Sequence, residues 1–145
     1  MPQLPSTTDL VIRNDIAQLA ILSEAMERFG SKHALAPKLL VQLQVALDEI
    51  VSNVIKYAWP EGGSHEIRVR ITFDSGQMTI EIADDGRSFD PRRAPPPEHL
   101  PDGQRPRPGG VGLHMVKQFM DSFEYARIDG WNHSTLSKAI DIRTK

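Results

Sequence analysis

The sequence contains no cysteine, which excludes disulfide bridges and metal sites built on thiolates. Its five histidines stand singly, without the spacing of metal ligands. The formal net charge is −2, which gives no general attraction to nucleic acid or to an anionic membrane. We therefore expect neither direct nucleic-acid binding nor a membrane-surface role.

The chain also lacks an apolar run long enough to span a membrane. Its first residues, MPQLPSTTD, have neither the basic nor the apolar region of a signal peptide. The 145 residues are 39% hydrophobic and 25% charged, which is typical of one globular domain with a single core. We expect a soluble, cytoplasmic protein.

Residues 37–59 carry the clearest helical pattern, and Pro37 and Pro60 suit its first turn and its end. Glu49 and Asn53 fall on its polar side one turn apart, so their side chains lie one above the other. A carboxylate and a carboxamide arranged in this way can share a magnesium ion and a polarised hydroxyl group. We interpret this face as one wall of an ATP site, and the alternative is a charged face that is merely solvated. The apolar side is formed by Leu40, Leu43, Leu47, Ile50, Val51, Val54 and Ala58.

Two weaker signals precede this helix. The short apolar run at residues 10–12 predicts an edge strand, and a helical pattern follows from Asp15. Asp15 suits the N-cap of this first helix, and Gly30 suits its C-terminal stop.

The strongest β signal is a hairpin. In HEIRVRITF (65–73) and QMTIEIAD (77–84), apolar and polar residues alternate, and Asp-Ser-Gly-Gln (74–77) predicts a two-residue turn between them. The resulting register pairs Phe73 with Met78, Ile71 with Ile80, Val69 with Ile82, and Arg70 with Glu81.

The same alternation directs Asp84 towards the core and Asp85 away from it. A carboxylate that points inwards is costly unless a partner compensates it. Asp84 is therefore the candidate functional residue of the pair. The alternative, an aspartate pair that only forms a turn before Gly86, is equally compatible with the local sequence.

Residues 86–110 are rich in proline, which excludes a regular helix or an interior strand. A loop of this length in a compact domain is often an active-site lid or a disordered segment. For its proline-rich middle we favour a solvated linker, whereas its two ends are expected near a ligand. The prolines are Pro91, Pro95, Pro96, Pro97, Pro101, Pro106 and Pro108.

Gly109, Gly110 and Gly112 then open an apolar helical pattern that begins at Leu113. Glycines at a helix start let backbone N–H groups approach an anion. No Lys-Ser or Lys-Thr follows the last glycine, so this is not a Walker loop. Two closing strands are expected at 123–128 and 136–142, with a turn at Asp129-Gly130 and an irregular segment at 131–135.

The order of these pieces resembles the GHKL ATPase superfamily. Glu-x-x-x-Asn on a helix comes first, Asp-x-Gly ends a strand, and Gly-x-Gly opens a helix after a long loop. Within this superfamily the chain is most similar to the small bacterial anti-sigma-factor serine/threonine kinases of the switch-protein type. The segments ALDEIVSNVIKYAW, IADDGRSFDP and GGVGLHMVKQFMD carry this similarity, which covers residues 10–142 or so.

The resemblance implies the Bergerat ATP-binding fold, a two-layer α/β sandwich. We expect a mixed, mainly antiparallel sheet with helices on one face. Residues 1–145 would form a single ATP-binding kinase domain, with a proline-rich ATP lid at residues 87–109.

The resemblance also implies roles for individual residues. Glu49 would be the catalytic base or orienting carboxylate for the attacking hydroxyl, and Asn53 would bind Mg²⁺. Asp84 would accept a hydrogen bond from the adenine amino group, which agrees with its inward direction. Gly86 would allow the base to approach closely.

The remaining nucleotide contacts would come from the second half of the chain. Gly110 and Gly112 would lend backbone donors to the phosphates as the lid closes, with Leu113 beside them. Thr135 would match the hydroxyl residue on a late strand of the family, and Arg105 or Arg107 would reach the γ-phosphate. The sequence departs from the family pattern at Ser88, where a glycine is frequent, at Tyr57, where histidine is common, and in its many lid prolines.

The implied function is an ATP- and Mg²⁺-dependent protein serine/threonine kinase. It would phosphorylate an anti-anti-sigma (STAS) partner and sequester a sigma factor, a regulatory scheme called partner switching, and members of the subfamily often form homodimers. One alternative is a nucleotide-dependent binding module without kinase activity. Another, the catalytic half of a histidine kinase acting in trans, is disfavoured because 145 residues leave no room for a dimerising histidine helix pair.

Overall fold

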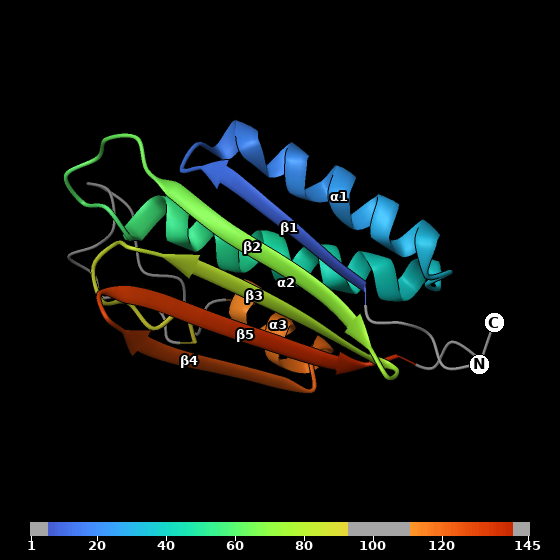
Figure 1. Ribbon diagram of the computed structural model, residues 1–145. Helices are drawn as coiled ribbons and strands as arrows, with labels where there is room; N and C mark the ends of the chain where they lie inside the picture. The colour runs from blue at the N-terminus through green and yellow to red at the C-terminus, as the bar shows by residue number, and fades with distance from the viewer. Residues whose placement is uncertain (1–5, 93–110, 141–145) are drawn as a thin grey trace.

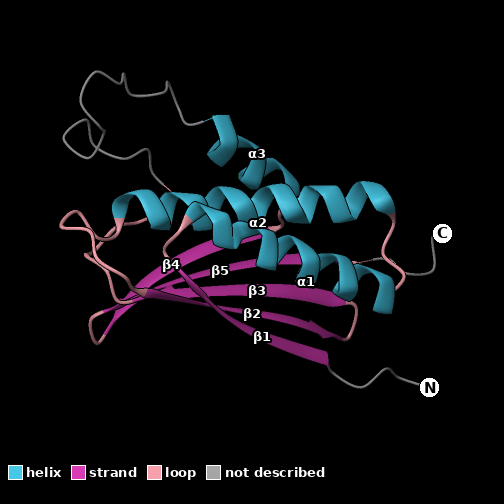
Figure 2. Ribbon diagram, turned by 90° about the horizontal axis from the view of Figure 1, so that it is seen from above, coloured by secondary structure: helices cyan, strands magenta, loops and turns pink. Residues whose placement is uncertain are grey.

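A computed structural model describes residues 6–92 and 111–140. These residues form five strands and three α-helices in two layers, with the sheet on one side and the helices on the other (Figures 1 and 2). The strand order is β1-β2-β3-β5-β4, and all four pairings are antiparallel. The expected two-layer α/β sandwich is confirmed. The strands are β1 (Ser6–Arg13), β2 (Glu66–Asp74), β3 (Gln77–Asp84), β4 (Ser122–Ile128) and β5 (Trp131–Ala139).

The first helical segment begins at the predicted cap, Asp15, but ends later than predicted. Asp15 caps a short 3₁₀ helix, η1 (Ile16–Gln18), through its side chain, and α1 (Leu19–Lys32) follows. Gly30 does not end α1, so that prediction was wrong. A Cβ atom at Gly30 would lie 3.0 Å from Leu40 Cδ1, so the glycine serves the close approach of two helices.

The central helix, α2 (Pro37–Tyr57), begins at Pro37 as predicted. Its apolar side packs on the sheet, where Leu43, Leu47 and Ile50 are almost fully buried. Figures 1 and 2 show α2 between α1 and the shorter α3 (Val111–Phe119), which contributes the buried Val116 to the same core. The helix that carries Glu49 and Asn53 therefore runs through the middle of the helical layer.

The central hairpin has the predicted register. Phe73 pairs with Met78, Ile71 with Ile80, Val69 with Ile82 and Arg70 with Glu81. Its turn residues Ser75 and Gly76 both have positive φ, 54° and 77°, as a type I′ turn requires. On the polar face, however, Arg70 forms its ion pair with Asp9 of β1, at 2.7 Å.

The last strand begins earlier than predicted. Residues 131–135, expected to be irregular, are the first half of β5, which pairs with both β3 and β4. The expectation failed because this half carries polar side chains on both faces, which hides the two-residue period. Asn132 and Ser134 are buried on the helix side, while Trp131 and His133 lie on the other.

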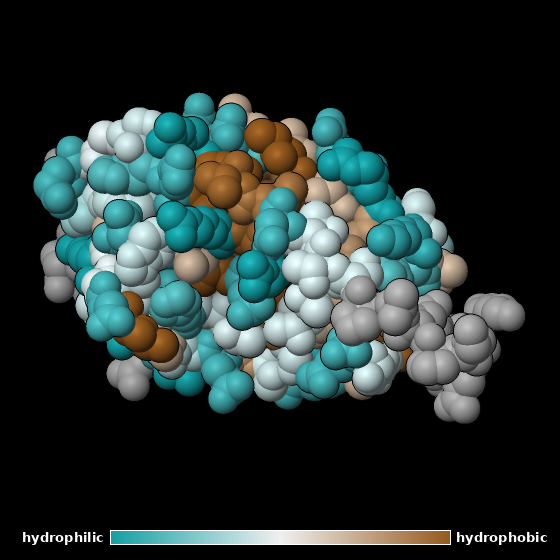
Figure 3. Space-filling view, viewed as in Figure 1, coloured by the Kyte–Doolittle hydropathy of each residue, from teal (hydrophilic) through white to brown (hydrophobic). Residues whose placement is uncertain are grey.

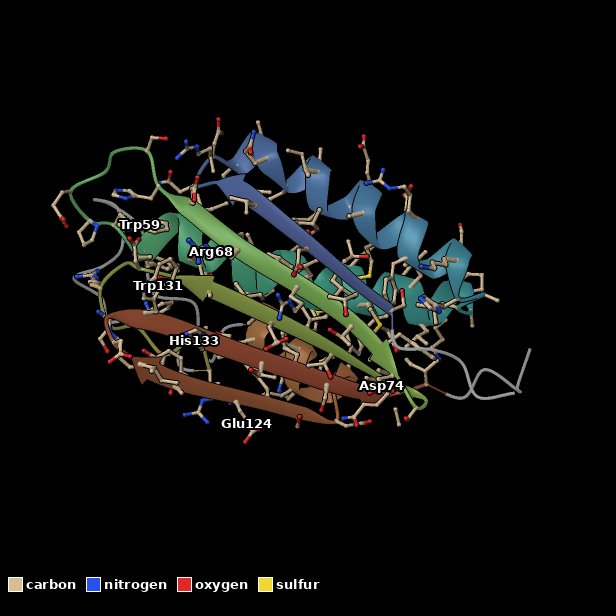
Figure 4. All side chains as sticks on the ribbon, viewed as in Figure 1. Trp59, Arg68, Asp74, Glu124, Trp131 and His133 are labelled. Carbon is tan, nitrogen blue, oxygen red and sulfur yellow. The ribbon has the colours of Figure 1, made fainter. Side chains whose placement is uncertain are left out.

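The second face of the sheet has no helix over it in the part of the chain that the structure describes (Figure 2). On this face Arg68 lies over the Trp131 ring, 4.7 Å from its centroid (Figure 4). Figure 3 shows an apolar patch near β1 and α1. Val11, Ile16 and Ile21 are among the exposed large hydrophobic residues. None of the described helices is both long and apolar enough to cross a bilayer.

Candidate functional site

Asp84 is buried at the end of β3, whereas Asp85 is exposed, as the alternation predicted. Its Oδ1 accepts hydrogen bonds from the Gly86 backbone N–H and from Asn132 Nδ2, both at 2.9 Å. Burial raises the pKa of the Asp84 carboxyl above its ordinary value, and the hydrogen bonds from Asn132 and Gly86 partly offset this rise. A buried carboxyl group of this kind is a common feature of ligand-binding sites.

The turn that follows Asp84 is fixed to the end of α2. Arg87 N–H donates to the Ala58 carbonyl at 2.9 Å, and Arg87 Nε donates to the Tyr57 carbonyl at 3.2 Å. A Cβ atom at Gly86 would lie 2.5 Å from Ala58 Cβ and 2.6 Å from Ala58 O. The structure therefore gives Gly86 a packing reason that the sequence did not reveal, namely contact with α2.

Glu49 and Asn53 lie on one half-buried face of α2. Asn53 Nδ2 donates to Glu49 Oε2 at 3.1 Å, which holds the two side chains together. The bond leaves Asn53 Oδ1 and Glu49 Oε1 without a hydrogen-bond donor among the described residues. This face thus presents one neutral oxygen and one carboxylate oxygen for further contacts.

The two parts of the candidate site are spaced along α2. Ala58 marks the position of the Asp84 turn, and Asn53 and Glu49 precede it by five and nine residues. At 1.5 Å per residue these positions lie about 8 Å and about 14 Å from Ala58 along the helix axis. An extended ligand anchored at Asp84 therefore has to follow the helix towards its N-terminus to reach both groups.

The donor set suits a magnesium ion only in part. No cluster of three or more His, Cys, Asp or Glu residues that could hold a metal occurs among the described residues. Mg²⁺ commonly keeps several waters and binds few protein oxygens besides substrate phosphates. Asn53 Oδ1 fits such a limited role, with most ligands supplied by phosphates and water.

Thr135 does not lie with the other candidates. It pairs with Glu81 and Glu124 on the face of the sheet that the helices leave uncovered. The physical reason is the two-residue period of β5, which directs Asn132 and Ser134 to the side of Asp84 and Thr135 away from it. The assignment of Thr135 to the nucleotide site is therefore incorrect.

The candidates around the predicted lid are only partly described. Gly112 and Leu113 lie in the first turn of α3, and Leu113 is buried. Gly110, Arg105, Arg107 and most of the lid at 87–109 lie outside the described residues. Gly86, which directly precedes the predicted lid, is fixed to β4, because Arg127 Nη1 donates to the Gly86 carbonyl at 2.6 Å.

Sequence reasoning missed Asn132, which contacts Asp84 directly. The sequence predicts an irregular segment around Asn132 and does not predict the β3–β5 pairing. The only signal for Asn132 is that it is a polar residue opposite Asp84 in that pairing. Tyr125 and Arg127 of β4 were also missed, because the register of their strand with β5 was not predicted. Tyr125 contacts Asn132, and Arg127 contacts Gly86.

Comparison with known proteins assigns the chain to a family. A model of the histidine kinase-like ATPase domain matches residues 12–138. The chain belongs to this family. The match spans α2, the Asp84 turn and β5, so it includes both parts of the candidate site, and membership implies ATP binding.

Two curated relatives are protein kinases by name. The chain is 30% identical over 112 residues to the serine/threonine-protein kinase BtrW of Bordetella bronchiseptica, covering 77% of this chain and 79% of that protein. It is 25% identical over 119 residues to the serine-protein kinase RsbW of Listeria monocytogenes, covering 79% and 74%. These relationships support a protein kinase.

Two solved structures share the fold. The crystal structure of the RsbU and RsbW domains of a Mycobacterium tuberculosis protein gives a TM-score of 0.67 at 12% identity, covering 92% of this chain and 32% of that one. A histidine kinase domain from Erythrobacter litoralis EL346 gives a TM-score of 0.54 at 17% identity, covering 86% and 60%. At these identities the likeness shows the fold alone.

Proposed function

We propose that this protein is an ATP-dependent protein serine/threonine kinase that acts in the cytoplasm on a STAS-domain anti-anti-sigma protein and also sequesters a sigma factor. The observation that carries the proposal is the Glu49–Asn53 pair on α2, which lies about 8 to 14 Å along the helix axis from the contact between Ala58 and the turn after the buried Asp84. The names of the two curated relatives support the same activity.

In this proposal Asp84 accepts a hydrogen bond from the adenine amino group through Oδ2, its oxygen without a described donor. The phosphates extend along α2 towards Asn53, whose Oδ1 contributes a ligand to Mg²⁺. When bound, Mg²⁺ neutralises charge on the phosphate oxygens. Gly112, at the start of α3, would lend a backbone donor to the phosphates.

Glu49 orients the attacking group. The hydroxyl oxygen of the substrate serine attacks the γ-phosphorus, the bond to the β-phosphate oxygen breaks, and ADP leaves. Glu49 Oε1 accepts the hydroxyl proton, while Oε2 keeps its hydrogen bond from Asn53. The Asn53 bond therefore fixes the carboxylate in one orientation during the transfer.

A second function, nucleotide-dependent binding without phosphoryl transfer, is favoured by Ser88. This exposed serine stands where related ATPases often carry a glycine, in the turn directly after Asp84 and Gly86. A module of this kind would bind ATP, change its affinity for a regulator, and leave every partner unphosphorylated.

The two functions are separated by incubating the protein with Mg-ATP and its cognate STAS-domain protein, followed by intact-mass measurement of the STAS protein. The kinase proposal expects the mass of one added phosphate, and the site should map to serine or threonine. An unmodified STAS protein together with measurable ATP binding would support the binding module instead.

A further inference from the structure

Asn132 is a buried asparagine whose side chain joins four parts of the fold. Its Nδ2 donates to Asp84 Oδ1 at 2.9 Å and to the Arg87 carbonyl at 2.8 Å. Its Oδ1 accepts from the Phe89 backbone N–H at 3.4 Å and from the Tyr125 hydroxyl. Asn132 is 3% exposed, and its bonds to Asp84 and to the Phe89 N–H are buried.

These contacts fix the orientation of the Asn132 amide. The Phe89 N–H can only donate and the Arg87 carbonyl can only accept, so the Asn132 amide cannot be reversed without losing both bonds. Nδ2 must therefore face Asp84. The register of the sheet adds to this constraint, since Asn132 and Asp84 are directly opposite in the β3–β5 pairing.

The consequence for Asp84 is that its two oxygens differ. A carboxylate oxygen has two lone pairs, and on Oδ1 both are used, by Asn132 Nδ2 and by the Gly86 N–H. Oδ2 accepts no hydrogen bond from any residue that the structure describes. Oδ2 is also accessible to solvent. Among the described residues, the only fully buried side-chain nitrogen or oxygen without a hydrogen-bond partner is His33 Nε2, so Asp84 Oδ2 is not fully buried.

One available oxygen suits one kind of base. Adenine presents a single exocyclic amino group next to a ring nitrogen that accepts, whereas guanine presents a ring N–H and an exocyclic amino group side by side. Two parallel donors are bound best by both oxygens of a carboxylate, in the fork arrangement that such groups favour. A carboxylate with one oxygen already saturated loses that arrangement.

We propose that Asn132 is a specificity-determining positioning residue: by saturating Oδ1 of Asp84, it leaves a single acceptor that selects the amino group of adenine over the paired donors of guanine. This inference rests on the proposed ATP site and deepens it. It assigns to Asn132 no contact with the nucleotide and no part in phosphoryl transfer.

Asn132→Thr tests the proposal, because threonine suits a strand but its hydroxyl cannot replace all four bonds of the amide. The matched control is Asn14→Thr. Asn14 also bridges two backbone segments, from Nδ2 to the Gly63 carbonyl at 2.9 Å and from the His65 N–H to Oδ1 at 2.8 Å, but it follows the edge strand β1. Both variants lose side-chain bonds that bridge backbone segments, and only one of them loses a bond to Asp84.

The measurement is calorimetric affinity for ATP and for GTP. The wild type and Asn14→Thr should prefer ATP equally, and Asn132→Thr should lose about tenfold or more of this preference. A folded Asn132→Thr protein with the wild-type ratio would overturn the inference while leaving the proposed function intact. A wild type that binds ATP and GTP equally well would overturn it too, and that result requires no variant. If the wild type binds neither nucleotide, the proposed function is rejected, and the inference about Asn132 is rejected with it.

A second readout requires no nucleotide. The hydrogen bond from Asn132 lowers the pKa of Asp84, so its removal should raise that pKa in a carbon-13 titration of the aspartate carboxyl groups. An unchanged Asp84 titration in Asn132→Thr would show that the bond is absent in solution and would contradict the inference.

Discussion

Asn53 Nδ2 donates a hydrogen bond to Glu49 Oε2 across one turn of α2, at 3.1 Å. The bond orients both side chains, because it uses Asn53 Nδ2 and Glu49 Oε2 and leaves Asn53 Oδ1 and Glu49 Oε1 available for other contacts. Two groups that the proposed reaction needs in different roles are thus held by one interaction. The consequences of breaking each half of the pair differ and can be measured separately.

Asn53→Ala should impair the use of Mg²⁺ without unfolding the protein. The side chain is half-buried and makes one hydrogen bond, so its loss should cost about 0.5–1.5 kcal/mol of stability. The Mg²⁺ concentration that gives half-maximal phosphoryl transfer should rise, as a titration at fixed ATP would reveal. Glu27→Gln, on the exposed side of α1, serves as the control. An unaltered Mg²⁺ dependence in Asn53→Ala would remove Asn53 from the metal site.

Asp84→Asn should weaken ATP binding and increase stability at neutral pH. An asparagine there can still accept bonds from Gly86 and Asn132, but it places an amide donor opposite the donor of adenine, so affinity should fall about tenfold or more. Burial raises the pKa of Asp84, so the folded protein holds this proton at pH values where the unfolded chain has released it. The contribution of Asp84 to stability is therefore present at low pH and is lost as pH rises through the raised pKa.

Urea denaturation from pH 4 to pH 8 checks the second half of this prediction. The wild type should lose stability relative to Asp84→Asn as the pH increases across this range. A difference in the opposite direction would mean that Asp84 is stabilised in its charged form, against the structure.

Gly86→Ala should destabilise the protein because the new methyl group would overlap the end of α2. The Cβ position lies 2.6 Å from the Ala58 carbonyl oxygen, which belongs to backbone and cannot turn aside. We expect a loss of about 1–3 kcal/mol in the free energy of unfolding. Ser88→Ala, an exposed change in the same turn, should stay within about 0.5 kcal/mol of the wild type. Equal effects of the two substitutions would contradict the packing role of Gly86.

His33 should make the protein sensitive to mild acid. Its ring stacks on Phe73 with centroids 4.6 Å apart, and burial together with the nearby charge of Lys32 lowers its pKa. The unfolded chain therefore takes up a proton near pH 6.5 that the folded protein refuses, so stability falls as the pH drops below that value. His33→Phe should abolish this part of the pH dependence in thermal melts between pH 7 and pH 5. If the Tm values of the wild type and of His33→Phe change equally between pH 7 and pH 5, His33 is not the source of the acid sensitivity.

The parts of the fold that local patterns determine were predictable. The central hairpin was predicted to the residue, because two alternating runs flank an Asp-Ser-Gly-Gln turn and allow one register only. Asp84 followed from the same alternation. Glu49 and Asn53 followed from the helical period, and the comparison with known families supports the overall interpretation.

The errors arose where the role of a residue depends on contacts with a distant part of the chain. The prediction that Gly30 ends a helix is wrong because its missing side chain accommodates Leu40 of the next helix. Thr135 was named from the family resemblance, and Asn132 was not considered, because the register of β5 with β3 decides which residues face Asp84 and no local pattern determines that register. Asn132 and Asp84 are 48 residues apart, and only the assembled sheet brings them together.

The central claim is that Glu49 serves the chemical step of a kinase rather than nucleotide binding or folding. Glu49→Gln tests it most directly, because glutamine keeps an acceptor for Asn53 Nδ2 and removes only the charge. In single-turnover transfer of labelled γ-phosphate from saturating Mg-ATP to the STAS protein, we expect ATP affinity to be retained. The transfer rate should fall about 10²–10⁴-fold. Transfer at the wild-type rate, or a loss of rate explained wholly by lost ATP binding, would contradict the account.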